Sequence, residues 1–211
     1  MTHPNKKELL LVLGGARSGK SSWALEYTEN HYDSYIFLAT AEVMDEEMAD
    51  RVRLHKEVRG PKWRLKEEPL EIAQVLETDV AGVEAILIDC MTIWLSNVLL
   101  KMGEEKVPEY RNALLEALAR TDQSVIIVSN EVGSGIVPEH PLGRQYRDMA
   151  GSLNQKLAAA DKVVMTVAGL PIFLKQPSPS PRKSSFHTIS IMRIRCITFW
   201  PTFGFPPFPF S

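Results

Sequence analysis

The chain has 211 residues, 45% of them hydrophobic, and a formal net charge of −2. This length is enough for one domain with a sizeable core. Because the charge is close to zero and no long basic patch is present, we expect no nucleic-acid partner. The polar start, MTHPNKKE, does not resemble a secretory signal, no apolar run is long enough for a membrane span, and two cysteines cannot build a disulfide framework. We therefore expect a cytoplasmic protein.

Apolar strands alternate with amphipathic helices along the first 175 residues. Most expected strands are continuous apolar runs, which is typical of a parallel sheet buried on both faces. The expected strands are Leu9–Leu13, Tyr35–Ala39, Ala85–Asp89, Val125–Ser129 and Val163–Val167. The expected helices are Ser22–Thr28, Asp45–Val58, Pro69–Thr78, Thr92–Met102, Pro108–Arg120 and Arg144–Ala160. This order predicts an α/β fold of the P-loop NTPase type, with a mainly parallel sheet and helices on both faces.

A phosphate-binding motif follows the first strand. The sequence GGARSGKS matches the pattern G-x-x-x-x-G-K-[ST], and its candidate nucleotide-binding residues are Gly14, Gly15, Ala16, Arg17, Ser18, Gly19, Lys20 and Ser21. The glycines allow backbone N–H groups to face a phosphate, and the next helix adds the positive end of its dipole. Lys20 would act as a catalytic cation on the outer phosphates, and the Ser21 hydroxyl suits Mg²⁺. A glycine-rich turn is the alternative, but it does not explain Lys20 and Ser21.

His55 lies in a segment rich in basic residues. If this segment is helical, His55 is four residues after Arg51 and four before Arg59, so three potentially cationic groups share one face. Such a face suits an anionic ligand, and the nearby cations favour a neutral, nucleophilic imidazole. Spacing alone nevertheless favours the simpler alternative, which is a solvated charged face with one histidine.

Two more features follow strands that would end at the same edge of the sheet. Asp89 ends an apolar strand, and a carboxylate in that place can hold Mg²⁺ directly or through water. The alternative is an aspartate that caps the next turn, but the phosphate motif in the same chain favours a metal or nucleotide role. The long loop at 130–143 is rich in glycine and proline, as binding loops at this edge often are.

Taken together, these residues resemble the bifunctional adenosylcobinamide kinase / adenosylcobinamide-phosphate guanylyltransferase family of cobalamin biosynthesis. The resemblance covers about residues 9 to 175. The motifs that carry it are GGARSGKS at Gly14–Ser21, Thr40, DEEMADR at Asp45–Arg51, His55-Lys56, Trp63-Arg64, Asn97, NEVGSGIVP at Asn130–Pro138, RQYRDMAG at Arg144–Gly151 and NQKLA at Asn154–Ala158. The phosphate motif alone is common to a superfamily, whereas the NEVG motif and the motifs behind it are far more specific.

The resemblance implies two reactions. A nucleoside triphosphate, ATP or GTP, phosphorylates the aminopropanol hydroxyl of adenosylcobinamide. GMP then passes from GTP to adenosylcobinamide phosphate through a histidine–GMP intermediate, which gives adenosylcobinamide-GDP. His55 is the implied guanylyl acceptor, and the family likeness also implies a homotrimer.

The resemblance also implies how the nucleotide is held. The candidate metal ligands, Ser21 and Asp89, follow from the phosphate motif and from the strand end described above. The implied nucleotide contacts outside the phosphate motif are Thr40, Ala41, Glu42, Lys56, Glu57, Val58, Arg59, Glu67 and Asp89. Two other interpretations stay open: another small-molecule kinase of P-loop type in which His55 is structural, and a nucleotide-binding module without catalysis.

The composition changes sharply near residue 176. Residues 176–211 carry seven of the 14 prolines, six of the eight phenylalanines, four Lys/Arg and no Asp or Glu, which leaves residues 1–175 with a net charge of −6. The family pattern ends near Lys175. We expect residues 1–175 to form the catalytic domain and 176–211 to form a disordered tail from an altered reading frame or a read-through. A proline-rich docking arm and a membrane-contacting tail are the alternatives.

Overall fold

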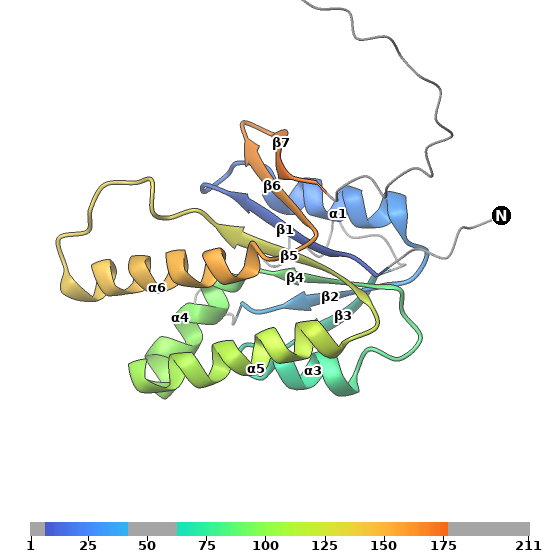
Figure 1. Ribbon diagram of the computed structural model, residues 1–211, viewed down its shortest axis with the longest axis horizontal. Helices are drawn as coiled ribbons and strands as arrows, with labels where there is room; N and C mark the ends of the chain where they lie inside the picture. The colour runs from blue at the N-terminus through green and yellow to red at the C-terminus, as the bar shows by residue number, and fades with distance from the viewer. Residues whose placement is uncertain (1–6, 42–62, 177–211) are drawn as a thin grey trace, which may run out of the picture. The chain divides into compact units, whose positions relative to one another are not determined.

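The structure is a computed structural model, and it describes residues 7–41 and 63–176 (Figure 1). The chain divides into two units, Met1–Pro177 and Ser178–Ser211, and all described residues belong to the first. The expected helix Asp45–Val58 and nearly all of the expected tail lie outside the described residues. No helix in the described part combines the length and the apolar character that crossing a membrane requires.

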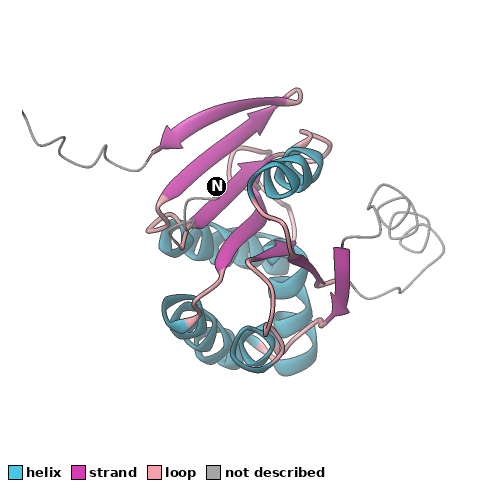
Figure 2. Ribbon diagram, turned by 90° about the vertical axis from the view of Figure 1, so that its right-hand side faces the viewer, coloured by secondary structure: helices cyan, strands magenta, loops and turns pink. Residues whose placement is uncertain are grey.

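In the described part of the chain, seven strands form one sheet in the order β3-β2-β4-β5-β1-β6-β7. The strands are β1 (Leu9–Gly14), β2 (Tyr35–Ala39), β3 (Trp63–Glu67), β4 (Ala85–Asp89), β5 (Ser124–Asn130), β6 (Lys162–Val167) and β7 (Leu170–Lys175). Every neighbouring pair is parallel except β6 and β7, which are antiparallel. Figure 2 shows the twist of the sheet between the β6–β7 hairpin at the top and β3 at the right. The predicted mainly parallel sheet is confirmed.

Helices cover both faces of this sheet, as the sequence predicts. They are α1 (Lys20–His31), α3 (Ile72–Thr78), α4 (Met91–Met102), α5 (Val107–Arg120) and α6 (Pro141–Leu157), with a 3-10 turn η1 (Glu104–Lys106). In Figure 1, α1 lies on one side of the sheet and α3 to α6 lie on the other. Successive strand residues point to opposite faces, so Leu10 and Val12 pack in the cluster that contains α1, whereas Leu11 and Leu13 pack in the cluster with α3 to α6. Because both faces are buried, the central strands are mostly apolar.

The sequence does not predict the two strands at the edges of the sheet. β3 is short, and Arg64, Leu65 and Glu67 are exposed. All six residues of β7 are exposed, and the strand contains Pro171. Proline has no N–H, and an edge strand tolerates it because one side of that strand forms no ladder hydrogen bonds. An edge strand is covered on fewer sides than a central one, so it lacks the apolar run that identifies the others.

Two helix starts differ from the prediction by three residues, and the other starts in the described residues differ by one or two. Pro69 is not the first residue of a helix, because α3 begins at Ile72. The Glu68 carboxylate accepts the backbone N–H groups of Leu70 (3.0 Å) and Glu71 (2.9 Å), which holds this segment in a turn instead. α6 begins at Pro141, earlier than the predicted Arg144. Proline at the first helical position loses no hydrogen bond, so the helix starts there rather than after the proline-rich loop.

A half-buried polar cluster connects Glu8, the residue before β1, to α1 and β6 at the amino end of the sheet. Lys162 Nζ lies 2.8 Å from Glu8 Oε2 and donates to the Tyr27 hydroxyl at 2.8 Å. The Tyr27 hydroxyl in turn donates to Glu8 Oε1 at 2.8 Å. Burial, followed by the hydrogen bond to Glu8, raises the pKa of Tyr27 above its ordinary value. The cluster is structural, because it lies at the end of the sheet opposite the phosphate motif.

We expect the folded protein to lose stability as the pH rises above about 10. The unfolded chain releases the Tyr27 proton near its ordinary pKa, but the folded chain retains it, so the Tyr27 contribution is complete below that pH and is lost above it. The loss is at most about 1.4 kcal/mol per pH unit. Urea unfolding of the wild type and Tyr27→Phe between pH 8 and 11 measures it: the variant should show the shallower fall, and equal slopes would contradict the assignment.

Candidate functional site

The carboxyl ends of the six parallel strands lie at one edge of the sheet, on the left in Figure 1. Gly14 of β1 is paired with Asn130 of β5, and Ala39 of β2 is paired with both Asp89 of β4 and Glu67 of β3. Neighbouring strands lie about 4.8 Å apart. The phosphate motif and the two predicted acids are therefore brought to one edge, which is the edge where open α/β sheets bind ligands.

The phosphate loop (Gly14–Ser21) bends tightly between β1 and α1. The Ser18 N–H donates to the Gly15 carbonyl at 3.3 Å. Gly19 is the N-cap of α1 with a φ of 90°, a left-handed conformation that glycine adopts without strain, and it has no side chain to occupy the N–H groups of the first turn. Lys20 Nζ donates to the Gly15 carbonyl at 3.1 Å, so the ammonium group lies over the loop. Free helix N–H groups and a cation placed over the loop are the two features that bind phosphate.

The end of β6 and the turn between β6 and β7 form hydrogen bonds that hold the phosphate loop in place. The Ser18 hydroxyl lies 2.9 Å from the Thr166 hydroxyl, and Thr166 donates to the Leu13 carbonyl at 3.2 Å. The Gly169 N–H donates to the Ser18 carbonyl at 2.9 Å. The sequence alone does not predict these contacts. The one available signal is a polar threonine within the apolar run of β6.

Gly14→Ala is expected to weaken nucleotide binding at least about tenfold. A Cβ at this position would lie 2.3 Å from Ser18 Oγ and 2.5 Å from Thr166 Oγ1, so the loop must shift, and such overpacking costs about 1–3 kcal/mol. Gly151→Ala is the control, because this glycine lies in α6 outside the phosphate loop and nothing lies within 4 Å of its added Cβ. Calorimetric titration with GTP measures both. Equal affinities in the two variants would show that packing behind the loop does not set its shape.

Thr40 is predicted to contact the nucleotide, and its side chain is also a structural link. Its hydroxyl donates to the Cys90 carbonyl and accepts the Cys90 N–H, both at 2.8 Å, and the residue is fully buried. The Asn97 amide donates to the Thr40 carbonyl at 2.8 Å. These contacts join the end of β2 to the turn between β4 and α4, where Asp89 lies. A nucleotide contact at Thr40 stays a prediction, as does that of the neighbouring Ala41.

The charges of Lys20 and Asp89 both affect the pKa of the buried Cys90 thiol. Burial, and then the negative charge of Asp89, raise the pKa of the Cys90 thiol, while the positive charge of Lys20 acts in the opposite direction. Lys20 and Asp89 therefore both lie near enough to Cys90 to affect its pKa. This placement suits Asp89 as the acid that faces a bound phosphate group or its cation, which stays a prediction.

A network of polar side chains lies behind the ends of β4 and β5. Asn130 Nδ2 donates to the Thr92 hydroxyl at 2.8 Å, and Asn154 Nδ2 donates to the Asn130 carbonyl at 3.0 Å. The Tyr146 hydroxyl donates to the Thr92 carbonyl at 2.7 Å, and burial raises the pKa of Tyr146 to about 12. Asn130 and Asn154 lie within motifs of the sequence, which alone assign them no function. Asn130 ends a buried strand just as Asp89 does, and that is the signal that could have identified it.

The predicted binding loop connects β5 to α6. Ile136 is 96% exposed and Val137 is 57% exposed. The end of the loop is fixed to α6, because Arg144 Nη1 donates to the Pro138 carbonyl at 3.0 Å and also to the Glu139 carbonyl. The loop therefore presents apolar side chains near the carboxyl edge of the sheet while its far end is anchored. That it binds a substrate stays a prediction.

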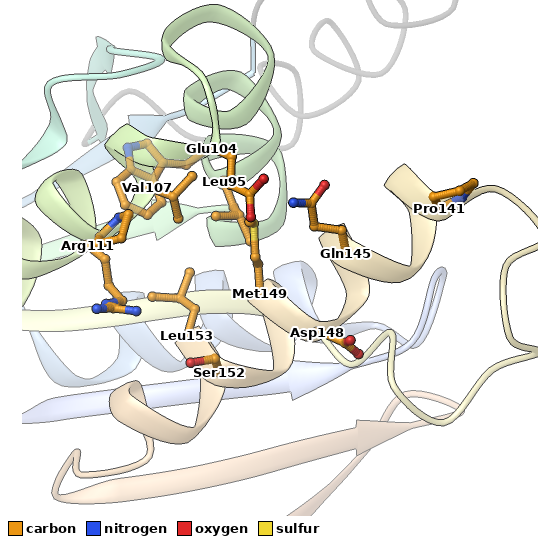
Figure 3. Close-up of a pocket in the computed structure, with 12 residues that line it drawn as sticks. Leu95, Glu104, Val107, Arg111, Pro141, Gln145, Asp148, Met149, Ser152 and Leu153 are labelled. Atoms are coloured by element: carbon orange, nitrogen blue, oxygen red, sulfur yellow. The ribbon is translucent and has the colours of Figure 1, made fainter.

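A cavity of about 750 Å³ lies between α4, α5 and α6, away from the phosphate loop (Figure 3). Its floor is apolar and its rim is polar. It is lined by Trp94, Leu95, Glu104, Val107, Pro108, Arg111, Pro141, Gln145, Asp148, Met149, Ser152 and Leu153. None of the predicted site residues lines it. Because the cavity lies on the face opposite α1, we assign it no part in nucleotide binding.

The remaining predicted site residues lie outside the described part of the chain. They are Glu42, His55, Lys56, Glu57, Val58 and Arg59. These residues belong to the segment that connects β2 to β3 along the chain. Both strands are part of the sheet that carries the site. The histidine proposed as the guanylyl acceptor is among them, so its role rests on the sequence.

Comparisons with known proteins agree on one family. The model of the family described as "Cobinamide kinase / cobinamide phosphate guanyltransferase" matches residues 10–174. The "Bifunctional adenosylcobalamin biosynthesis protein CobP" of Pseudomonas aeruginosa is 42% identical over 166 residues, which cover 78% of this chain and 96% of that protein. The CobU proteins with the same description are 38% identical in Salmonella typhimurium and 36% identical in Escherichia coli, each covering 79% of this chain and 99% of theirs. Among solved structures, a KaiC-like protein of Pyrococcus horikoshii OT3 has a TM-score of 0.44 at 13% identity, and the match covers 75% of this chain and 70% of that one.

Proposed function

Because the chain belongs to the cobinamide kinase / cobinamide phosphate guanyltransferase family, we propose that it carries out both reactions of that family. It phosphorylates the aminopropanol hydroxyl of adenosylcobinamide with a nucleoside triphosphate, ATP or GTP. It then transfers GMP from GTP to the product and forms adenosylcobinamide-GDP. Since both reactions consume nucleoside triphosphates, we place the enzyme in the cytoplasm.

The observation that supports this proposal best is the geometry of the phosphate loop. The N–H groups at the start of α1 are not taken up by a capping side chain, and Lys20 lies over the loop. Asp89 and Glu67 lie along the same edge of the sheet. A loop of this shape binds a triphosphate, and the acids beside it can contact the cation or the nucleoside.

In the kinase reaction, the residues of the chain bind and position the triphosphate. The substrate hydroxyl oxygen attacks the γ-phosphorus, the bond from the γ-phosphorus to the bridging oxygen breaks, and the nucleoside diphosphate leaves with the electron pair while the hydroxyl proton passes to solvent. Lys20 neutralises the negative charge on the phosphate oxygens, and the N–H groups of α1 hold the phosphates in place. Preorganised donors of this kind act without reorganising during the reaction.

The residues available for Mg²⁺ fit that ion. Ser21 and Asp89 would supply hard oxygen ligands, and Mg²⁺ in such sites takes only one or two protein oxygens together with substrate phosphates. Within residues 7–41 and 63–176, no group of three or more His, Cys, Asp or Glu is placed to hold a metal ion. When bound, the cation supplies charge neutralisation on the transferred group.

In the guanylyl transfer, His55 is the proposed nucleophile. Its ring nitrogen attacks the α-phosphorus of GTP and pyrophosphate leaves. A phosphate oxygen of adenosylcobinamide phosphate then attacks the histidine-bound phosphorus, the N–P bond breaks, and a pyrophosphate linkage forms. Two easier steps replace one difficult step. Lys56, Glu57, Val58 and Arg59 would hold the nucleotide beside this histidine, together with Thr40, Ala41 and Glu42.

Assembly as a homotrimer is part of the same proposal. The edge strand β7 supports association in general, because Leu170, Ile172 and Leu174 are 69%, 49% and 58% exposed. A row of exposed apolar side chains on an edge strand favours contact with another surface. We also propose that residues 176–211 form a tail outside the catalytic domain.

The proposal is tested by following two labels with the full-length wild-type protein. Phosphate from γ-labelled ATP should appear on cobinamide, and GMP from α-labelled GTP should appear first on the protein, in an acid-labile bond, and then in cobinamide-GDP. Phosphorylation without protein labelling would instead indicate a small-molecule kinase in which His55 is structural. Nucleotide binding without either product would indicate a binding module.

A further inference from the structure

Asn130 lies between the two parts of the proposed kinase site. The strand order places β5 between β1 and β4, so the residue that ends β5 lies between the phosphate loop and the strand that ends in Asp89. Asn130 is paired with Gly14, and the next N–H, that of Glu131, donates to the Gly14 carbonyl at 3.0 Å. Asn130 is therefore part of the same strand edge as the phosphate loop.

The amide of Asn130 is fixed at its nitrogen end. Nδ2 donates to the Thr92 hydroxyl at 2.8 Å, and the Thr92 hydroxyl also lies 3.1 Å from Cys90 Sγ. The Thr92 carbonyl accepts the Tyr146 hydroxyl at 2.7 Å. The backbone of Asn130 is held separately, because its carbonyl accepts Asn154 Nδ2 at 3.0 Å. Contacts from α4 and α6 thus fix both the backbone and the side chain.

The oxygen end of the same amide has no partner. Oδ1 of Asn130 is buried, and no hydrogen-bond donor from the described residues reaches it. A buried carbonyl without a partner is costly, and such groups in folded proteins call for an explanation. No other buried side-chain nitrogen or oxygen of the described residues lacks a hydrogen-bond partner. The fold therefore holds the Asn130 amide in place without supplying a donor for Oδ1.

The chemistry of an amide oxygen restricts which group can form the missing hydrogen bond to Oδ1. It is only an acceptor, so its partner must carry a hydrogen atom, and the phosphate oxygens of a triphosphate would be repelled. At the reacting end of a loaded kinase site, the O–H donors would be the hydroxyl that is phosphorylated and the water molecules on the metal ion. Asn130 cannot remove a proton, because an amide is not a base at neutral pH.

We propose that Asn130 Oδ1 accepts a hydrogen bond from an O–H donor in the loaded kinase site and so positions the reacting groups. This inference rests on the proposed function. With the substrate hydroxyl as donor, the bond would orient the hydroxyl oxygen toward the γ-phosphorus. With a metal-bound water as donor, it would fix the cation that accompanies the triphosphate. In both cases the new O–P bond and the leaving group are those of the kinase reaction described above.

Asn130→Ala tests the proposal, and Thr92→Val is the matched control. The alanine variant removes the acceptor, whereas the valine variant removes the partner of Nδ2 and leaves the acceptor in place. We expect Asn130→Ala to lower the rate of cobinamide phosphorylation about 10- to 100-fold, as the loss of a positioning contact does, and Thr92→Val to lower it much less. GTP affinity without metal should change less than about threefold in both variants, since the Asn130 and Thr92 side chains bond to each other and the backbone pairing of Asn130 with Gly14 is kept.

The pattern of the losses distinguishes the two donors. A fall in kcat/KM for cobinamide with normal covalent labelling by GMP identifies the substrate hydroxyl. A fall in both activities that added Mg²⁺ restores identifies a metal-bound water. The proposal is overturned if Asn130→Ala is as active as the wild type, if Thr92→Val matches it in every measurement, or if both activities fall and Mg²⁺ restores neither. If Asn130→Ala unfolds, Asn130→Ser replaces it under the same criteria. Inactive wild-type protein would instead refute the proposed function.

Discussion

Replacing His55 by alanine is expected to abolish covalent labelling of the protein by GMP and to stop the formation of cobinamide-GDP. The imidazole is the proposed nucleophile, and alanine leaves no group that can form the N–P bond. Phosphorylation of cobinamide should continue at a measurable rate, because that phosphate passes directly to the substrate hydroxyl. Incubation with α-labelled GTP, followed by denaturing electrophoresis, measures the label. Incubation with γ-labelled ATP and cobinamide measures the kinase reaction in the same preparation.

His31→Ala is the matched control for this change. His31 lies in the last turn of α1, at the end of the helix opposite the phosphate loop, where its ring stacks on Tyr27. Its loss should leave the covalent label unchanged. If His55→Ala still accumulates bound GMP, the acceptor is another residue. If both histidine variants lose the label, the effect comes from folding rather than from chemistry.

Lys20→Ala is expected to reduce both reactions by at least about 100-fold, which corresponds to about 2.7 kcal/mol of transition-state stabilisation. Both reactions need a positioned triphosphate, and Lys20 supplies the cation that lies over the phosphate loop. The binding of GTP should weaken as well, because the phosphates lose a charged partner in the ground state. Steady-state rates with ATP and GTP, together with calorimetric titration of GTP, measure the two effects.

Lys156→Ala separates this local effect from a change in overall charge. Lys156 is exposed in the last turn of α6, at the other end of the sheet. The control removes the same charge and should keep normal rates, within about 0.5 kcal/mol in stability. Normal GTP turnover in Lys20→Ala would refute the assignment of the phosphate loop.

The sequence predicts the centre of the sheet much better than its edges. The five central strands are buried on both faces, so each one leaves a run of apolar residues that needs no knowledge of its neighbours. β3 and β7 are edge strands, and most of their residues are in contact with solvent. Their sequences therefore need not be apolar. Helix ends are harder for a similar reason. The Glu68 carboxylate that delays α3 competes for N–H groups, and a pattern of apolar residues does not record that competition.

The candidate site divides in the same way. The phosphate loop is predicted because one continuous segment contains all of its residues, and Asp89 is predicted because it ends an apolar strand. Thr166 and Gly169 support the loop from about 150 positions away in the chain, and such contacts arise only when the strands pair. The vacant acceptor on Asn130 is harder still to predict, since it depends on which atoms of an amide the surrounding helices leave unsatisfied.

The hydrogen bond from the Gly169 N–H to the Ser18 carbonyl has a consequence for regulation. It connects the β6–β7 turn, at an outer edge of the sheet, directly to the loop that binds phosphate. If a partner surface binds along β7 and restrains this turn, the free energies of association and of nucleotide binding become coupled. Such coupling is reciprocal, so a partner that tightens nucleotide binding by some factor is itself bound more tightly by the same factor when nucleotide is present. The concentration of GTP would then help to determine how much of the protein is assembled, and dilution would weaken its hold on GTP.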